Sequence, residues 1–209
     1  MAHRTLQRAS EHLDIVKGSR FQAWVAPIGD EAEAAAALRR ARAARPDAHH
    51  LAWAWRLGDV LRWSDDGEPG GTAGRPMLEV VLKRDLDRVV VTVARVFGGV
   101  KLGAGGLARA YAGAVARALD AVTVVEVPDR RTFTARAPFA DADALLRLLA
   151  DPAVAHAPPA FTADGVHVGG SVLAAAAAEF ERRAIEATRG RVRWTWVNSA
   201  DGPAADQRK

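Results

Sequence analysis

The chain has 209 residues, 49% hydrophobic and 26% charged, which is the composition of a globular protein with one large or two small domains. It lacks cysteine, which excludes disulfide bonds, thiolate catalysis and cysteine-based metal sites. The net charge of +4 is too small to indicate nucleic-acid binding by itself, so such binding would need a local basic patch. The sequence contains neither a secretory signal nor a run of about 18 apolar residues, so we expect a cytoplasmic protein with no membrane partner.

The N-terminal half predicts strands that alternate with helices. Alternating apolar residues from Phe21 onward indicate a strand. Asp30 is a suitable N-cap for the alanine-rich helix that follows, which Pro46 would end. A run rich in β-branched residues after Arg88 indicates a buried strand. The expected strands are 16–28, 49–58, 60–64 and 88–97, and the expected helices are 31–45, 75–85 and 105–122.

The C-terminal part predicts a second domain with the order β-α-β-β-α-β, which is the ferredoxin-like split unit. Asp141 is the expected cap of its first helix, and Asp164-Gly165 is the expected turn between its two middle strands. The expected elements are a strand at 131–139, a helix at 141–151, two strands within 155–172, a helix at 173–190 and a strand at 191–197. We therefore divide the chain into domains 1–127 and 128–198, followed by a disordered tail at 199–209.

A glycine-rich loop with basic residues follows the predicted buried strand and precedes a helix. Such a loop can turn backbone N–H groups toward an anion at the helix N-terminus. The segment "GAGGLA" matches the dinucleotide pattern G-x-G-x-x-[GA], but the usual acidic partner is missing and no Walker loop is present, so we expect no cofactor. A tight structural turn is the alternative. The candidate phosphate or RNA contacts are Arg20, Arg75, Arg95, Gly98, Gly99, Lys101, Gly103, Gly105, Gly106 and Arg109.

A second loop, "SDDGEPGGTAGR", carries three acidic residues, Asp65, Asp66 and Glu68. They could bind Mg²⁺, exchange a proton in catalysis, or cap the following helix. We favour the capping and loop-stabilising role and assign no metal site. The adjacent His49 and His50 would point to opposite faces of a strand, so the two imidazoles are not expected to chelate one metal ion.

Two long segments carry a family resemblance. "SDDGEPGGTAGRPML" and "VARVFGGVKLGAGGLARAYAGAV" closely resemble the YigZ/IMPACT family, and "GSRFQAWVAP", "PDAHHLAWAW" and "ATRGRVRWTW" fit its other blocks. The resemblance implies an α+β fold, with an N-terminal α/β sandwich like a domain of a small-subunit ribosomal protein. It also implies a ferredoxin-like C-terminal domain.

The resemblance also implies a role in the regulation of translation, because eukaryotic relatives act on a translation kinase through protein contacts. We therefore expect a binding protein that contacts RNA or a ribosome-associated factor through its glycine-rich basic face. One alternative is an enzyme that acts on a phosphorylated or nucleotide substrate at the same cleft. Another is a regulator that binds only proteins. The sequence contains no DNA-specific motif and leaves the oligomeric state open.

Overall fold

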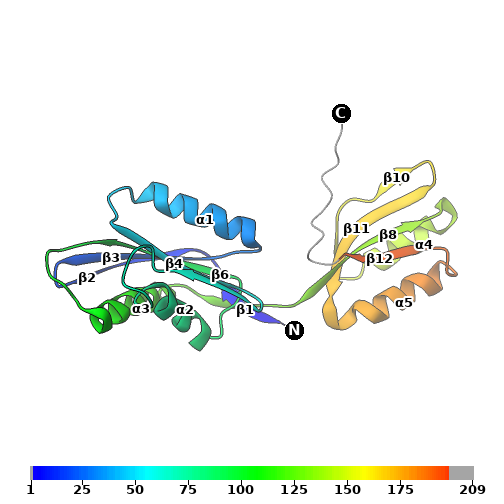
Figure 1. Ribbon diagram of the computed structural model, residues 1–209. Helices are drawn as coiled ribbons and strands as arrows, with labels where there is room; N and C mark the ends of the chain where they lie inside the picture. Colours follow the sequence, from blue (N-terminus) through cyan, green and yellow to red (C-terminus); the bar gives the residue numbers. More distant parts are fainter. Residues whose placement is uncertain (1, 198–209) are drawn as a thin grey trace. The chain divides into compact units, whose positions relative to one another are not determined.

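A computed structural model describes residues 2–197, and these form two compact units that divide after Val127 (Figure 1). Each unit combines antiparallel strands with helices, and the chain contains five α-helices within the described range. The α+β fold class expected from the sequence is therefore confirmed. The expected disordered tail at 199–209 lies outside the described residues.

The N-terminal unit is built on a five-stranded antiparallel sheet with the order β2-β3-β6-β4-β5. A separate two-stranded sheet pairs β1 with β7. The strands are β1 (His3–Leu6), β2 (Ser10–Val16), β3 (Ser19–Pro27), β4 (His50–Leu57), β5 (Val60–Ser64), β6 (Val89–Val96) and β7 (Val124–Val127). The helices are α1 (Glu31–Ala44), α2 (Gly74–Lys83) and α3 (Ala104–Asp120).

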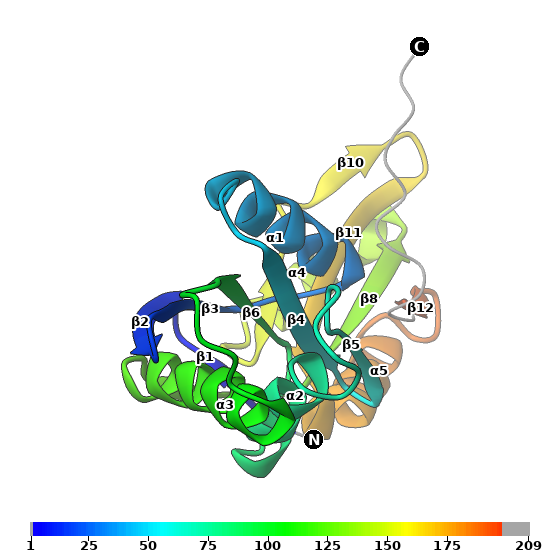
Figure 2. The same cartoon turned by 60° about the vertical axis from the view of Figure 1, so that its left-hand side comes forward.

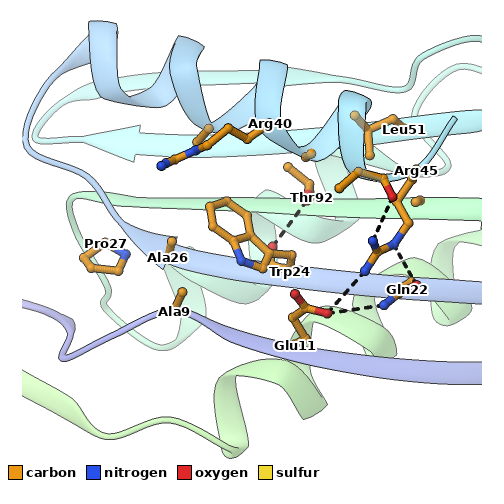
Figure 3. A pocket seen from close by; sticks show the side chains of 14 residues that line it. Ala9, Glu11, Gln22, Trp24, Ala26, Pro27, Arg40, Arg45, Leu51 and Thr92 are labelled. Atoms are coloured by element: carbon orange, nitrogen blue, oxygen red, sulfur yellow. Dashed lines mark hydrogen bonds and ion pairs between the residues drawn. The ribbon is translucent and has the colours of Figure 1, made fainter.

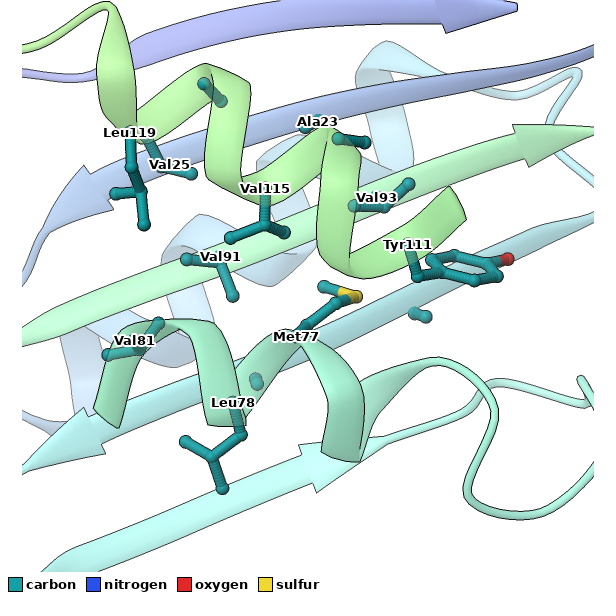
Figure 4. Close-up of a cluster of buried hydrophobic side chains, with 14 of the residues drawn as sticks. Ala23, Val25, Met77, Leu78, Val81, Val91, Val93, Tyr111, Val115 and Leu119 are labelled. Atoms are coloured by element: carbon teal, nitrogen blue, oxygen red, sulfur yellow. The ribbon is translucent and has the colours of Figure 1, made fainter. Parts of the chain in front are cut away.

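Helices cover both faces of this sheet, with α2 and α3 on one face and α1 on the other (Figure 2). Because side chains alternate along a strand, odd-numbered residues of β3 and β6 point toward α2 and α3, and even-numbered ones point toward α1. The α2/α3 face holds the larger core (Figure 4). Its fully buried side chains include Phe21, Met77, Val91, Tyr111 and Leu119. This continuous burial explains why apolar periodicity predicted these elements well.

The sequence-based assignment was wrong at the N-terminus of this unit. Most of the predicted strand at 16–28 is strand β3, but Val16 ends the preceding strand β2, and Lys17 and Gly18 form the hairpin turn between the two strands, with φ angles of 47° and 80°. Strand β2 lies at the sheet edge and begins with three polar residues, so it lacks the apolar run of a central strand. The strands β1 and β7 are four residues long each and give too little periodicity to detect.

The C-terminal unit has the sheet order β10-β11-β8-β12, and the short strand β9 also pairs with β11. This order and the succession of elements are ferredoxin-like. The elements are β8 (Arg130–Ala137), α4 (Ala142–Leu149), β9 (Val154–His156), β10 (Ala160–Thr162), β11 (Gly165–Leu173), α5 (Ala177–Ala187) and β12 (Arg193–Val197). The helices and sheet enclose a core around Phe133, Leu145 and Phe180.

One expected cap in this unit is not formed. The Asp141 carboxylate makes no capping hydrogen bond to α4. It instead accepts hydrogen bonds from Arg191 Nε and Nη2 at 2.7 and 2.5 Å. A guanidinium offers a charged, two-point contact, which is stronger than a single neutral backbone N–H bond. The ion pair therefore ties the start of α4 to the segment before β12.

Candidate functional site

The acidic loop between β5 and α2 is organised by Asp65. One carboxylate oxygen accepts a hydrogen bond from Gly71 N at 2.8 Å, and the other accepts from Ala73 N and Gly74 N at 2.9 and 2.8 Å. Gly74 is the first residue of α2, so Asp65 satisfies an N–H group at the start of that helix. The structure therefore places Asp65 in a loop-stabilising position.

Asp66 fixes the same loop to neighbouring elements. Its carboxylate accepts hydrogen bonds from Leu51 N at 2.5 Å and from an Arg42 guanidinium nitrogen at 2.6 Å. Its backbone oxygen lies 2.8 Å from His50 Nδ1, which makes Nδ1 the protonated nitrogen because a carbonyl can only accept. The loop is thereby attached to β4 and to α1.

Glu68 points inward and connects the acidic loop to β6 and α3, the two elements that flank the glycine-rich loop. Its Oε1 accepts hydrogen bonds from Arg95 Nη1 at 2.6 Å and from the Tyr111 hydroxyl at 2.7 Å. The side chains of Glu68 and Arg95 are only 3% and 7% exposed, so this is a buried ion pair. Burial, reinforced by the Glu68 carboxylate, raises the pKa of Tyr111, so its hydroxyl remains a donor.

Arg95 also contacts two aromatic rings at this junction. Its guanidinium carbon lies 5.4 Å from the Phe21 ring centroid and 5.6 Å from that of Phe97. Both distances suit cation–π attraction. Figure 4 shows the Tyr111 ring at one end of the row of core side chains, with its hydroxyl directed away from them. The Glu68–Arg95 ion pair and the Phe21 and Phe97 rings therefore pack together where the acidic loop, β6 and the start of the glycine-rich loop come close.

The glycine-rich loop rests on the β2–β3 turn. A Cβ atom at Gly98 would lie 1.9 Å from the carbonyl carbon of Gly18, so only glycine fits there. Gly98 N also donates to Ser19 Oγ at 3.1 Å. Gly99 and Gly103 have φ angles of 87° and 71°, which favour glycine, and both are exposed.

Beyond Gly98, the loop presents an exposed surface that continues into α3. No described side chain caps this helix. Gly106 is partly covered by Leu102, whereas Gly105 is exposed in the first turn. We call the exposed set the glycine-loop surface, and it consists of Phe97, Gly99, Val100, Lys101, Gly103, Gly105 and Arg109.

The structure does not bring all the predicted cations onto this surface. Arg20 lies on the α1 side of the sheet and forms an ion pair with Asp47 at 3.0 Å. Arg95 is on the opposite side, because it pairs in register with Phe21 rather than with Arg20. It is buried against Glu68, with 7% of its side chain exposed, so it does not belong to the exposed basic residues. Arg75 is exposed and lies 3.6 Å from Glu79 on its own helix.

The sequence interpretation missed Tyr111 as part of the site. It is the only tyrosine of the chain, and a hydroxyl on an otherwise apolar helix face needs a buried partner. That signal could have linked α3 to the acidic loop. Within residues 2–197, no three His, Asp or Glu side chains gather closely enough to bind a metal ion. Over the same range, no helix combines the length and hydropathy of a membrane-spanning segment.

Comparison with known proteins identifies the fold and the family. Residues 17–119 match the Impact N-terminal domain. The chain is 49% identical over 125 residues to an "IMPACT family member in pol 5'region" of Thermus thermophilus, covering 60% of this chain and 68% of that protein. It is 41% identical over 113 residues to "IMPACT family member YigZ" of Escherichia coli, covering 52% of this chain and 55% of that relative.

A solved structure extends the similarity to both units. A crystal structure described as a hypothetical protein aligns with a TM-score of 0.74 and 30% identity, covering 95% of this chain and 98% of the other. The two long motifs that resemble the YigZ/IMPACT family, 64–78 and 93–115, are connected in the structure by the bonds of Glu68 to Arg95 and Tyr111. The chain therefore belongs to the IMPACT family.

Proposed function

We propose that this chain regulates translation by binding RNA through the glycine-loop surface. Family membership supports a translation-related role, and the direction of the charges supports an anionic ligand. The single observation that carries the proposal is the inward orientation of Glu68, which is neutralised by Arg95 beneath the loops. The ionisable side chains of the glycine-loop surface are Lys101 and Arg109, and both are exposed.

The backbone of this surface suits contact with phosphate. Exposed glycines carry no side chain that would hold a ligand away from the backbone N–H groups. The uncapped first turn of α3 adds N–H groups whose dipoles favour negative charge. The exposed Phe97 ring, 43% accessible, offers a face on which a base can stack.

The positions of the carboxylates favour a binding role over catalysis at the same cleft. Asp65 accepts three backbone hydrogen bonds, and Asp66 accepts one from a backbone N–H and one from Arg42. Glu68 is occupied by Arg95 and Tyr111. A bound Mg²⁺ ion or an added proton would weaken these contacts, which hold the loop together.

The test is a titration of a fluorescently labelled single-stranded RNA at several salt concentrations. We expect affinity to fall as salt rises, because bound phosphates release counterions. The double variant Lys101→Ala/Arg109→Ala should bind more weakly and lower the slope of log K against log salt by about 1.4, at ~0.7 per phosphate contact. The control Arg39→Ala/Lys83→Ala removes the same charge from exposed positions on α1 and α2 and should retain wild-type binding.

Two results would contradict the proposal. One is the absence of RNA binding and of co-sedimentation with ribosomes at low salt. The other is equal weakening by the test and control pairs, because this would indicate attraction by net charge alone.

A further inference from the structure

The α1 face of the N-terminal sheet contains a groove that the sequence did not predict. Its volume is about 460 Å³, within the size range of small-molecule sites. It runs between α1 and strands β2, β3 and β6 (Figure 3). The glycine-loop surface contributes none of its lining residues, so this groove is a separate site.

Small side chains create the groove. Helix α1 packs mainly over β4 and β6, and it faces the hollow with Ala37, Ala41 and Ala44. Opposite these, the sheet contributes small residues such as Ala26 and Ala94. Alanine on both walls leaves space that larger side chains would fill in an ordinary core. The hollow is therefore a consequence of the alanine-rich helix.

Trp24 supplies the large apolar surface inside this hollow. Its side chain is half-buried, and Figure 3 shows it lying between α1 and β2. Close to its backbone, Thr92 Oγ1 donates to the carbonyl oxygen of Trp24 at 3.5 Å. An indole face bordered by alanines accommodates a flat apolar body better than a branched one, because ring faces stack with little loss of conformational freedom.

The polar end of the groove is closed by a network that is already satisfied. Arg45 Nε donates to Gln22 Oε1 at 2.8 Å, and Arg45 Nη2 donates to Glu11 Oε2 at 3.3 Å. Gln22 Nε2 donates to the same Glu11 oxygen at 3.3 Å. The charges of Arg45 and Glu11 therefore balance each other, and this end attracts neither sign strongly.

Arg40 provides the uncompensated charge. Figure 3 shows it on α1, away from the Arg45 network and beside the Trp24 end of the groove. It is exposed, and no hydrogen bond or ion pair joins it to another residue within 2–197. A guanidinium at the mouth of an apolar hollow favours a carboxylate, sulfonate or phosphate on the molecule that enters.

We propose that this groove binds a small organic anion with a flat, apolar body, which stacks on Trp24 and places its acidic group at Arg40. The body takes up the space left by the alanines of α1. The acidic group finds a cation there that forms no ion pair with any residue in the range 2–197.

The test compares two fluorescent probes that differ by one charged group. 8-Anilinonaphthalene-1-sulfonate has the apolar rings and the anion, whereas N-phenyl-1-naphthylamine has the rings alone. We expect saturable binding of the sulfonate probe and about fivefold weaker binding to Arg40→Ala, the size of one partly exposed ion pair. The neutral probe should bind Arg40→Ala as it binds the wild type.

Matched variants on the same helix supply the controls. Ala41→Leu fills the groove and should weaken the binding of both probes. Ala43 is exposed and does not line the groove, so Ala43→Leu should leave the binding of both probes unchanged. Arg39→Ala removes the neighbouring cation and should leave both probes unaffected. Thermal unfolding of each variant shows whether the fold is retained. The proposal is overturned if the sulfonate probe shows no saturable binding, or if Ala41→Leu and Arg40→Ala bind it as the wild type does.

Discussion

The two faces of the N-terminal sheet use their helices in different ways. On the α2/α3 face, large side chains such as Met77, Leu119 and Tyr111 are fully or almost fully buried against the strands. On the other face, α1 buries only Ala34 and Ala37 and leaves a cavity of about 460 Å³ beside them. The same strands thus carry a large core on one side and, on the other, a smaller core around Trp55 and Val90 beside an open groove.

One small sheet can in this way combine a stable core with space for a ligand. The dense face buries apolar area, which supplies most of the folding free energy, and it includes the Glu68–Arg95 pair beneath the glycine loop. A loop fixed from below can present its backbone to a ligand with little loss of entropy on binding. The alanine face contributes less to stability and leaves room for a ligand.

The largest expected effect comes from breaking the buried ion pair on the dense face. Glu68→Gln removes the carboxylate and leaves the Arg95 charge without compensation in a site that water barely reaches. We expect a loss of about 3–5 kcal/mol in the free energy of unfolding of the N-terminal unit. Urea unfolding measures it. Glu79→Gln, on the exposed surface of α2, is the control and should change the free energy by less than about 0.5 kcal/mol. A loss as small as that of the control would contradict a structural role for Glu68.

A smaller effect should distinguish the two faces directly. Ala114 on α3 is fully buried, so Ala114→Leu overpacks the dense core and should cost about 1–3 kcal/mol. Ala41→Leu makes the same change beside the groove, where space is available, and should cost less than about 0.5 kcal/mol. Parallel urea unfolding of the two variants tests the comparison. Equal losses would show that the two faces are packed alike.

The smallest effect concerns acid stability at the rim of the dense face. Burial of the Asp14 carboxyl raises its pKa, but hydrogen bonds from Arg117 and His12 more than offset this, so its pKa is lowered. The ionised Asp14 carboxylate therefore stabilises the fold at pH values above about 4, its pKa in the unfolded chain. This contribution is lost as the pH falls through the lower pKa of the folded state. Asp14→Asn should be less stable than the wild type near neutral pH, and the gap should close in acid.

Chemical unfolding at a series of pH values between about 6 and 3 measures this gap. Asp120→Asn at the end of α3 serves as the comparison, because this carboxylate also meets an arginine, Arg84, but is exposed to solvent. A gap for Asp14→Asn that stays constant with pH would show that the Arg117 contact does not depend on the ionised carboxylate.

The sequence was sufficient to predict the elements from β3 to α3, because their apolar periodicity reflects the dense core. It was insufficient for β1, β2 and β7, which are short or lie at an edge and bury few side chains. The ferredoxin-like order of the second unit followed from its helix and turn signals. The expected cap at Asp141 was wrong because a distant guanidinium offered a better partner.

The two motifs singled out in the sequence are connected in the structure by Glu68, which bonds to Arg95 on β6 and to Tyr111 on α3. Strand alternation could have separated Arg20 from Arg95, because they pair with residues that point to opposite faces. The groove could not be predicted, since it arises from volume that alanines of α1, β3 and β6 leave empty where these elements come together in the fold.

The most direct test of the proposed function is a two-dimensional ¹⁵N–¹H NMR titration of the full chain with single-stranded RNA. Our account predicts that the amide signals of Gly99, Lys101, Gly103 and the first turn of α3 shift together and saturate with the binding curve. Signals from the groove beside Trp24 should remain in place. RNA binding that shifts other amides while those of the glycine-loop surface stay unchanged would contradict it.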